Sequence, residues 1–158
     1  FAAAPLLFPE LAGYTVSEEL NYGELMELAQ RSGYLILYGR TELMHSEYCP
    51  IGAAVGGRAK GVSCSVPCQK MDYALKDRKG EVFPILTDVF CRSYIMNSKI
   101  KNNLDQQKLL AGQGFKHFRI DLTTETYEEA QTVIRALIDG EGRYIADHTR
   151  GHYKRGVE

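Results

Sequence analysis

The sequence lacks the features that would assign it at once to a membrane or to a nucleic acid. No apolar run approaches the roughly 18 residues of a membrane-spanning helix, and the apolar opening FAAAPLLFPEL has no basic start of a signal peptide. A surplus of one charge is missing too, because 19 Lys and Arg residues stand against 20 Asp and Glu residues. The net charge of −1 gives no global field toward nucleic acid, although a local basic patch stays possible. We therefore predict a cytoplasmic protein with no membrane partner.

Internal repeats and low-complexity linkers are also absent, and the composition is that of a folded domain. With 158 residues, 44% of them hydrophobic and 25% charged, the chain has room for one domain with a real core. It begins at Phe1 without an initiator methionine, which suggests a processed product or a part of a longer protein.

Short apolar runs alternate with helical patterns along the chain. Possible capping boxes, Asn21 with Glu24 and Thr126 with Glu129, predict the starts of two helices, and Gly33 is expected to end the first. No period is visible from residue 40 to residue 70. The patterns predict strands at 13–21, 34–39, 91–98 and 115–122, helices at 22–32, 102–114 and 127–140, and a hairpin at 71–86 with its tip at 77–80.

This alternation predicts an α/β fold in which strands near Thr15, Leu37 and Arg119 are parallel neighbours. A full eight-stranded barrel needs about 250 residues, so the sheet is either open or the C-terminal half of a TIM-like (β/α) barrel. We predict the half-barrel, as one domain over 1–158 with an insert at 40–100. Because a half-barrel leaves unpaired edges, we expect a partner: the missing N-terminal half, another subunit or a second copy of the chain.

Four cysteines lie within the expected insert, with the spacing C-x14-C-x3-C-x22-C. Disulfides need an oxidising compartment, and buried structural thiols need an apolar surrounding that the segment SCSVPCQ does not offer. A metal centre is the better interpretation, because nearby prolines and glycines allow the tight backbone that four thiolates need. Short C-x2-C knuckles are missing, which favours an iron-sulfur cluster and leaves zinc as the alternative. The predicted metal ligands are Cys49, Cys64, Cys68 and Cys91.

Charged residues follow the ends of the three predicted parallel strands, where α/β proteins build their sites. Arg40 is the main catalytic candidate, since a guanidinium offers paired donors to a carboxylate or phosphate; a salt bridge to Glu19 or Glu42 is the structural alternative. Glu42 and His45 are candidates for acid and base work, although His45 could equally hydrogen-bond within its loop. We expect Glu18 to be a solvated rim charge. Candidate substrate-binding residues are Glu19, Asn97, Lys99 and Asp121, although residues 97–99 could equally form only a turn. Candidate RNA contacts in the tail are His148, Arg150, His152 and Lys154; a disordered basic terminus is the commoner alternative.

Several segments together carry a resemblance to a known family. In chain order they are TVSEELN, YGRTELMHSEYCPIG, CSVPC, LKDRKGEVFPI, CRSYIMNSK, FRIDL and RGHYKRG. They resemble the C-terminal half of the collagenase-like peptidase family U-32. The resemblance spans nearly the whole chain and implies the later strands of a barrel-like catalytic domain with a four-iron cluster on four cysteines. Some members are classed as proteases, and others hydroxylate RNA or the ubiquinone ring without oxygen.

Protease motifs are absent from the chain: neither H-E-x-x-H nor a nucleophile with an evident base is visible. Cysteines that bind a cluster cannot serve as nucleophiles, and peptide hydrolysis has no evident use for a redox centre. We therefore predict an iron-sulfur enzyme domain for oxygen-independent hydroxylation of RNA or a small aromatic substrate. The alternative is a peptidase in which the four cysteines hold structural zinc.

Overall fold

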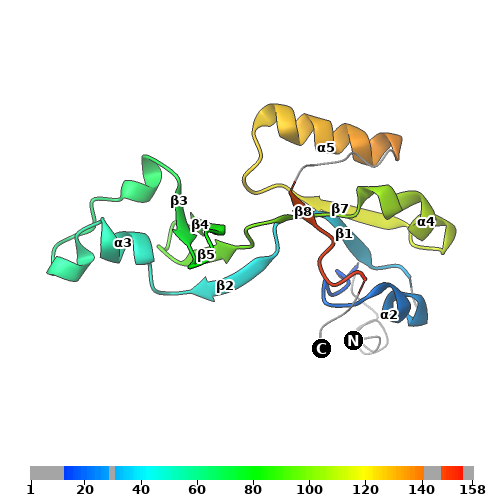
Figure 1. Cartoon of the computed structure of the whole chain (residues 1–158), viewed down its shortest axis with the longest axis horizontal. Helices are drawn as coiled ribbons and strands as arrows, with labels where there is room; N and C mark the ends of the chain where they lie inside the picture. Colours follow the sequence, from blue (N-terminus) through cyan, green and yellow to red (C-terminus); the bar gives the residue numbers. More distant parts are fainter. Residues whose placement is uncertain (1–12, 29–30, 141–146, 155–158) are drawn as a thin grey trace. The chain divides into compact units, whose positions relative to one another are not determined.

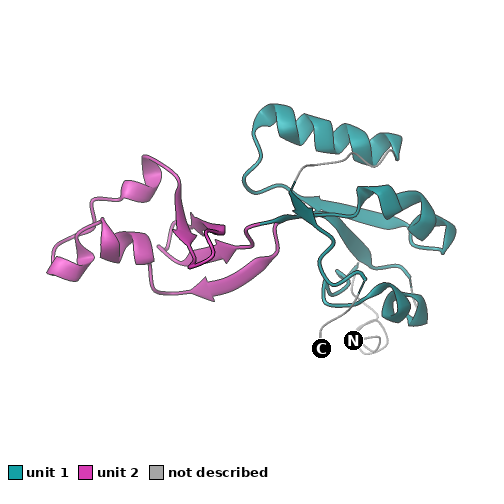
Figure 2. Ribbon diagram, in the orientation of Figure 1, with its two compact units in different colours: residues 1–39, 99–158 teal, residues 40–98 magenta. Residues whose placement is uncertain are grey.

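The computed structural model describes residues 13–28, 31–140 and 147–154 (Figure 1). The chain divides into two compact units: residues 1–39 with 99–158 form the first, and residues 40–98 form the second (Figure 2). The second unit is thus inserted into the first between two neighbouring strands. Its bounds lie close to those expected for the insert at 40–100.

The first unit contains a four-stranded sheet in the order β7-β1-β6-β8. The strand β1 (Tyr34–Gly39) is parallel to β7 (His117–Asp121), and Thr15 forms a parallel bridge with Tyr34. The prediction that these three segments are parallel neighbours is therefore confirmed. The segment 13–21 makes only this single bridge, so the full strand expected there is wrong. Among the described residues the sheet stays open and does not close into a barrel.

Two short strands of this sheet were not predicted. The strand β6 (Ile100–Asn102) runs antiparallel to β1, with Gly39 opposite Lys101, and β8 (His148–Thr149) runs parallel to β6. Strands of three and two residues are too short to show a hydrophobic period. Gly39, the last residue of β1, lies opposite Lys101 of β6. The inserted segment therefore begins and ends beside this pair of neighbouring strands.

Helices of the first unit cover β1 with apolar side chains. The helix α2 (Tyr22–Glu27) begins with the predicted capping box, but it ends at Leu28 and not at Gly33. Gly33 is needed for another reason, since an added Cβ would lie 2.5 Å from the ring of Tyr14. The predicted helix at 102–114 is the 3-10 turn η3 (Leu104–Gln106) with α4 (Gln107–Gly112), and α5 (Tyr127–Asp139) has the predicted capping box. The buried cluster comprises Val16, Leu25, Leu35, Leu37, Tyr38, Leu104, Leu110, Phe115, Val133 and Ala136.

The second unit is an antiparallel sheet in the order β2-β5-β4-β3 with a long irregular segment. Its hairpin, β3 (Tyr73–Lys76) and β4 (Val82–Thr87), is confirmed, with Gly80 at φ +90° and the Asp77 carboxylate accepting hydrogen bonds from the amides of Lys79 and Glu81. The strand β5 (Ser93–Met96) confirms the strand predicted at 91–98.

The strand β2 (Glu42–Ser46) contradicts the expectation of irregular structure from residue 40 onward. Four of its five residues are exposed, so the strand lacks the alternation of buried and exposed residues by which a sequence reveals a strand. The rest of this segment holds α3 (Pro50–Ala54) and two 3-10 turns, η1 (Arg58–Lys60) and η2 (Pro67–Gln69).

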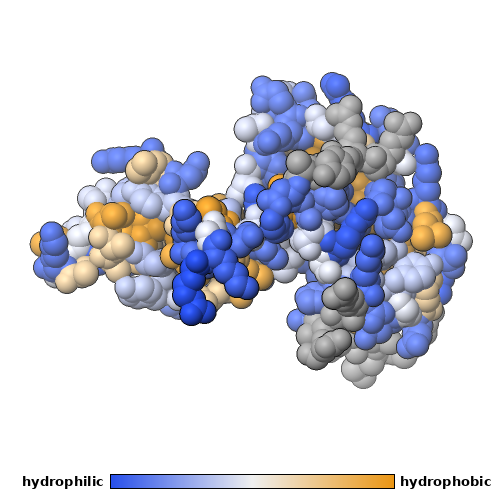
Figure 3. All heavy atoms as spheres, viewed as in Figure 1, coloured by the Kyte–Doolittle hydropathy of each residue, from blue (hydrophilic) through white to orange (hydrophobic). Residues whose placement is uncertain are grey.

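The hydrophobic core of the second unit is small. Its cluster has three buried residues, Cys49, Ile51 and Ile85, with Cys68 and Tyr73 packed beside them. Large apolar side chains are instead exposed, among them Val89 at 90% and Phe90 at 75%, and Figure 3 shows apolar surface on this unit. Units of this size with so little core usually need a disulfide, a metal or a partner for stability.

Candidate metal centre

All four cysteines line one cavity of about 470 Å³ in the second unit. Cys49 is the N-cap of α3, Cys64 lies in the loop after η1, Cys68 belongs to η2, and Cys91 lies in the turn between β4 and β5. The structure therefore brings together thiols from four separate segments. All four are free, and Cys49 is buried while the other three are partly exposed.

The backbone beside these cysteines is strained at two positions. Cys91 has φ +62° and Val66, between Cys64 and Cys68, has φ +52°. Residues with a Cβ rarely adopt this left-handed region, and a β-branched residue before a proline is an unusual case. Three non-glycine residues of the described part have positive φ, and two of them lie here. Strain of this kind persists only where the surrounding structure maintains it, and such positions are common at functional sites.

Backbone groups also approach the sulfur atoms. The amide of Gly52 donates a hydrogen bond to Cys49 Sγ at 3.3 Å. At Gly56 an added Cβ would lie 2.6 Å from Cys64 Sγ, so only glycine lets the chain pass this thiol. Two glycines of this segment, Gly52 and Gly56, thus allow close approach of the backbone to sulfur.

Two charged side chains line the cavity, and their surroundings differ. The Asp88 carboxylate accepts hydrogen bonds from Arg92 Nε at 2.6 Å, from the Tyr94 hydroxyl at 3.2 Å and from the amides of Phe90 and Arg92. Burial opposes its ionisation, but these hydrogen bonds outweigh that effect and hold the pKa of Asp88 below its usual value. Arg58 is exposed and, within the described residues, its guanidinium makes no hydrogen bond or ion pair.

A single zinc ion and a four-iron cluster would need different separations of the four sulfur atoms. Four thiolates around one zinc ion, with bonds of about 2.3 Å, stand only about 3.8 Å apart. No group of three or more His, Cys, Asp or Glu side chains in the described part of the chain is arranged to hold one ion. In a four-iron cluster each cysteine binds a different iron, so the sulfur atoms stand farther apart around a larger volume. All four cysteines line the same cavity, so they are the residues that would hold either group.

The other candidates of the second unit lie outside this cavity's lining. Arg40 donates through Nη1 to the carbonyl oxygens of Asn97 at 2.9 Å and Ser98 at 2.7 Å, and so ties together the two ends of the inserted segment. His45, which is exposed, stacks on Tyr94 across the β2-β5 pair, with ring centroids 4.7 Å apart. Glu42 is exposed at the start of β2. Their catalytic roles stay predictions.

Candidate residues of the first unit are also engaged separately. Glu19 is exposed in a turn, Lys99 forms an ion pair with Asp147, and Asp121 accepts from Arg119 Nε at 2.5 Å. Lys99 and Asp121 thus each have a charged neighbour of their own, and the substrate-binding roles of these residues stay predictions.

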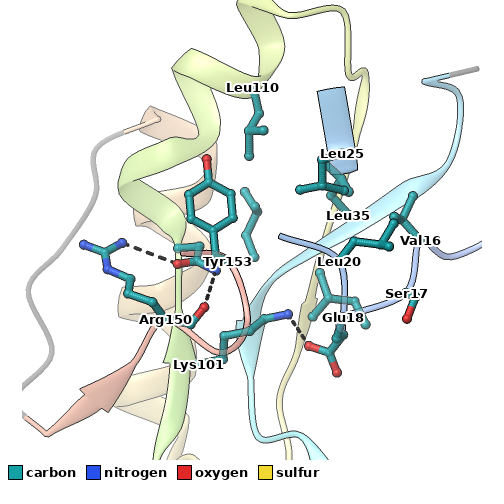
Figure 4. A pocket seen from close by; sticks show the side chains of 13 residues that line it. Val16, Ser17, Glu18, Leu20, Leu25, Leu35, Lys101, Leu110, Arg150 and Tyr153 are labelled. Atoms are coloured by element: carbon teal, nitrogen blue, oxygen red, sulfur yellow. Dashed lines mark hydrogen bonds and ion pairs between the residues drawn. The ribbon is translucent and has the colours of Figure 1, made fainter. Parts of the chain in front are cut away.

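Glu18 is not the solvated rim charge that was expected. Its carboxylate pairs with Lys101, whose side chain is only 6% exposed, and Figure 4 shows the ammonium group pointing at the carboxylate. The pair borders a cavity of about 30 Å³ beside Tyr153, whose pKa burial raises to about 12. This volume holds about one or two water molecules and no substrate.

In the tail, Arg150 is held by residues of the first unit, and RNA contacts of the tail stay a prediction. Arg150 pairs with Asp105 and also donates to the carbonyl oxygen of Asn102 at 3.1 Å. Hydrogen bonds from Arg150 lower the pKa of Asp105. Neither Arg58 nor Asp88 forms a motif with the cysteines in the linear chain, so no sequence signal marks them as residues of this cavity.

Comparisons with protein-family models, curated proteins and solved structures return no match for this chain. Among the described residues no helix has the length and apolar character to cross a membrane. The site must therefore be interpreted from its own geometry.

Proposed function

We propose that the second unit binds an iron-sulfur cluster through its four cysteines, and that the chain is a domain of a redox enzyme. The observation that carries this proposal is the single cavity that Cys49, Cys64, Cys68 and Cys91 line together. Left-handed backbone at Cys91 and the hydrogen bond from Gly52 to Cys49 support a ligand role for these thiols.

We further propose membership of peptidase family U-32 and oxygen-independent hydroxylation of RNA or a small aromatic substrate. This part rests on the resemblance of the sequence segments and on the four cysteines that line one cavity. When bound, the cluster would supply electron transfer. The protein's own contribution at the site is to orient four thiols, to donate an amide hydrogen bond to one of them and to keep the Asp88 carboxylate neutralised by Arg92.

The second candidate is a peptidase in which the cysteines hold structural zinc. One observation favours it: the core of the second unit is so small that any bound metal would contribute much of its stability. No group of three or more His, Cys, Asp or Glu side chains in the described part of the chain is arranged to hold a metal ion, so metal analysis has to decide between the two candidates.

The test is purification without oxygen, followed by visible absorption and by assays of iron, acid-labile sulfide and zinc. A brown protein with iron and sulfide, both lost when cysteines are replaced by serine one at a time, is the expected result. A matched control is Ser63→Ala, which changes a neighbouring residue without removing a thiol. A colourless protein that carries stoichiometric zinc and cleaves gelatin would overturn the proposal in favour of the peptidase.

A cofactor-loaded protein then allows the substrate to be tested. Hydroxylation is a two-electron oxidation, so without O2 the assay must contain an oxygen-atom donor that is itself reduced by two electrons. Mass spectrometry of RNA and of small aromatic compounds incubated with the loaded protein and such a donor would detect an added oxygen atom. We expect a partner to be required as well, since exposed apolar side chains on the second unit leave surface for the missing barrel half, another subunit or a second copy.

A further inference from the structure

Arg58 is a charged residue of the cysteine cavity without a role in the proposed ligand set. The cavity is lined by two charged side chains, Arg58 and Asp88. The negative charge of Asp88 is compensated by its ion pair with Arg92, and its carboxylate accepts three further hydrogen bonds. The guanidinium of Arg58, by contrast, has no hydrogen-bond or ion-pair partner in the part of the chain that is described. The cavity therefore contains one uncompensated positive charge.

The position of Arg58 relative to sulfur follows from Gly52, which lies between them. A Cβ added at Gly52 would lie 3.3 Å from Arg58 Nε and 3.5 Å from Cys49 Sγ. These two atoms are therefore within about 7 Å of each other, a separation at which opposite charges attract appreciably. The same glycine donates its amide to Cys49 Sγ. Gly52 thus leaves room for the Arg58 side chain on the same side of the backbone as the Cys49 thiol.

We propose that Arg58 sets the reduction potential of the cysteine-bound centre by compensating its negative charge. This inference rests on the proposed function, because it presupposes a redox centre on the four cysteines. A centre held by four thiolates carries net negative charge, and one added electron makes it more negative. A nearby cation stabilises the reduced form more than the oxidised form, so it raises the potential. No bond forms or breaks in this step, and in the test the electron comes from dithionite.

The experiment is a dithionite titration of the loaded protein with mediators, followed by visible absorption and by electron paramagnetic resonance. Arg58→Gln is expected to bind iron like the wild type but to lower the ratio of reduced to oxidised centre about tenfold at a fixed potential, or about 59 mV for one electron. Arg58→Lys keeps the charge and is expected to restore most of that shift. Lys60→Gln removes an exposed charge two residues away that does not line the cavity, and it should leave the potential unchanged.

A second variant tests the geometry without changing any charge. Gly52→Ala places a methyl group 3.1 Å from Arg58 Cδ, which is tight enough to displace this flexible side chain, while the helix α3 tolerates alanine. It should lower the potential in the same direction as Arg58→Gln, and the double variant should add little. Adding salt should reduce the difference between wild type and Arg58→Gln, because Arg58 is exposed.

The outcomes separate this inference from the proposed function. Iron binding with equal potentials in wild type and Arg58→Gln, or an equal shift in Lys60→Gln, would overturn the role of Arg58 and leave the cluster in place. If Arg58→Gln fails to bind iron, an unchanged potential in Gly52→Ala overturns the role and a lowered one supports it. A wild-type protein that binds no iron would overturn the proposed function and this inference with it.

Discussion

Replacing Cys91 by glycine and by alanine should separate the cost of its backbone from the use of its thiol. Cys91 has φ +62° in the turn between β4 and β5, where its amide donates to the carbonyl oxygen of Asp88. A residue with a Cβ in this conformation costs about 1 to 2 kcal/mol relative to glycine. Both replacements remove the thiol, but only glycine removes the strain. We therefore expect metal-free Cys91→Gly to be about 1 kcal/mol more stable than metal-free Cys91→Ala.

The assay is urea unfolding of the metal-free variants, monitored by circular dichroism because the chain has no tryptophan. Iron content after reconstitution should fall equally in both variants if Cys91 is a ligand. Equal stability of the two variants would show that the left-handed backbone at Cys91 does not exist without metal. Full iron binding by Cys91→Gly would refute the reasoning that the strain is maintained to hold a ligand.

Three further results are expected for the whole chain. Glu18→Gln should lower the free energy of unfolding by about 3 kcal/mol, because it leaves the Lys101 ammonium buried and without its carboxylate. Glu19→Gln, in the exposed turn, should change the free energy of unfolding little, and equal effects of the two variants in urea unfolding would refute this prediction. Hydrogen bonds from Arg150 lower the pKa of Asp105 below 3.8, so this pair stabilises the fold above that pH and its contribution is lost as the pH falls further. Arg150→Met should therefore make the free energy of unfolding less sensitive to acid, and an unchanged pH profile would contradict this prediction. Sedimentation of the isolated chain should show self-association, and a stable, fully active monomer would rule out the expected need for a partner.

Local patterns determined much of the first unit. Both capping boxes, at Asn21 and Thr126, form as predicted because each involves only four consecutive residues. The apolar run at 34–39 predicted a strand buried between parallel neighbours, and β1 has that place beside β7 and Thr15.

In the second unit the hairpin at Asp77 to Gly80 follows from the same kind of short-range information, since an Asp side chain and a positive-φ glycine make the turn.

Tertiary structure decided the elements and contacts that depend on distant residues. The exposed strand β2 exists because β5 pairs with it, and the three-residue strand β6 exists because β1 lies opposite. Neither has an apolar pattern long enough to be seen alone. The helix α2 ends at Glu27, well before Gly33, and Gly33 instead lies close to the ring of Tyr14.

For the candidate site, the sequence identified the four cysteines and the glycines among them, but it did not show which residues surround the cysteines in space. Only the folded second unit places Cys49 and Cys91, 42 positions apart in the chain, on one cavity and brings Asp88 and Arg58 to its wall. Arg40 shows the opposite case: the sequence placed a guanidinium at a strand end, and the fold engages it with the carbonyl oxygens of Asn97 and Ser98. Residue type and spacing limit which chemistry is available, whereas the environment of each charge depends on through-space contacts that a linear chain does not specify.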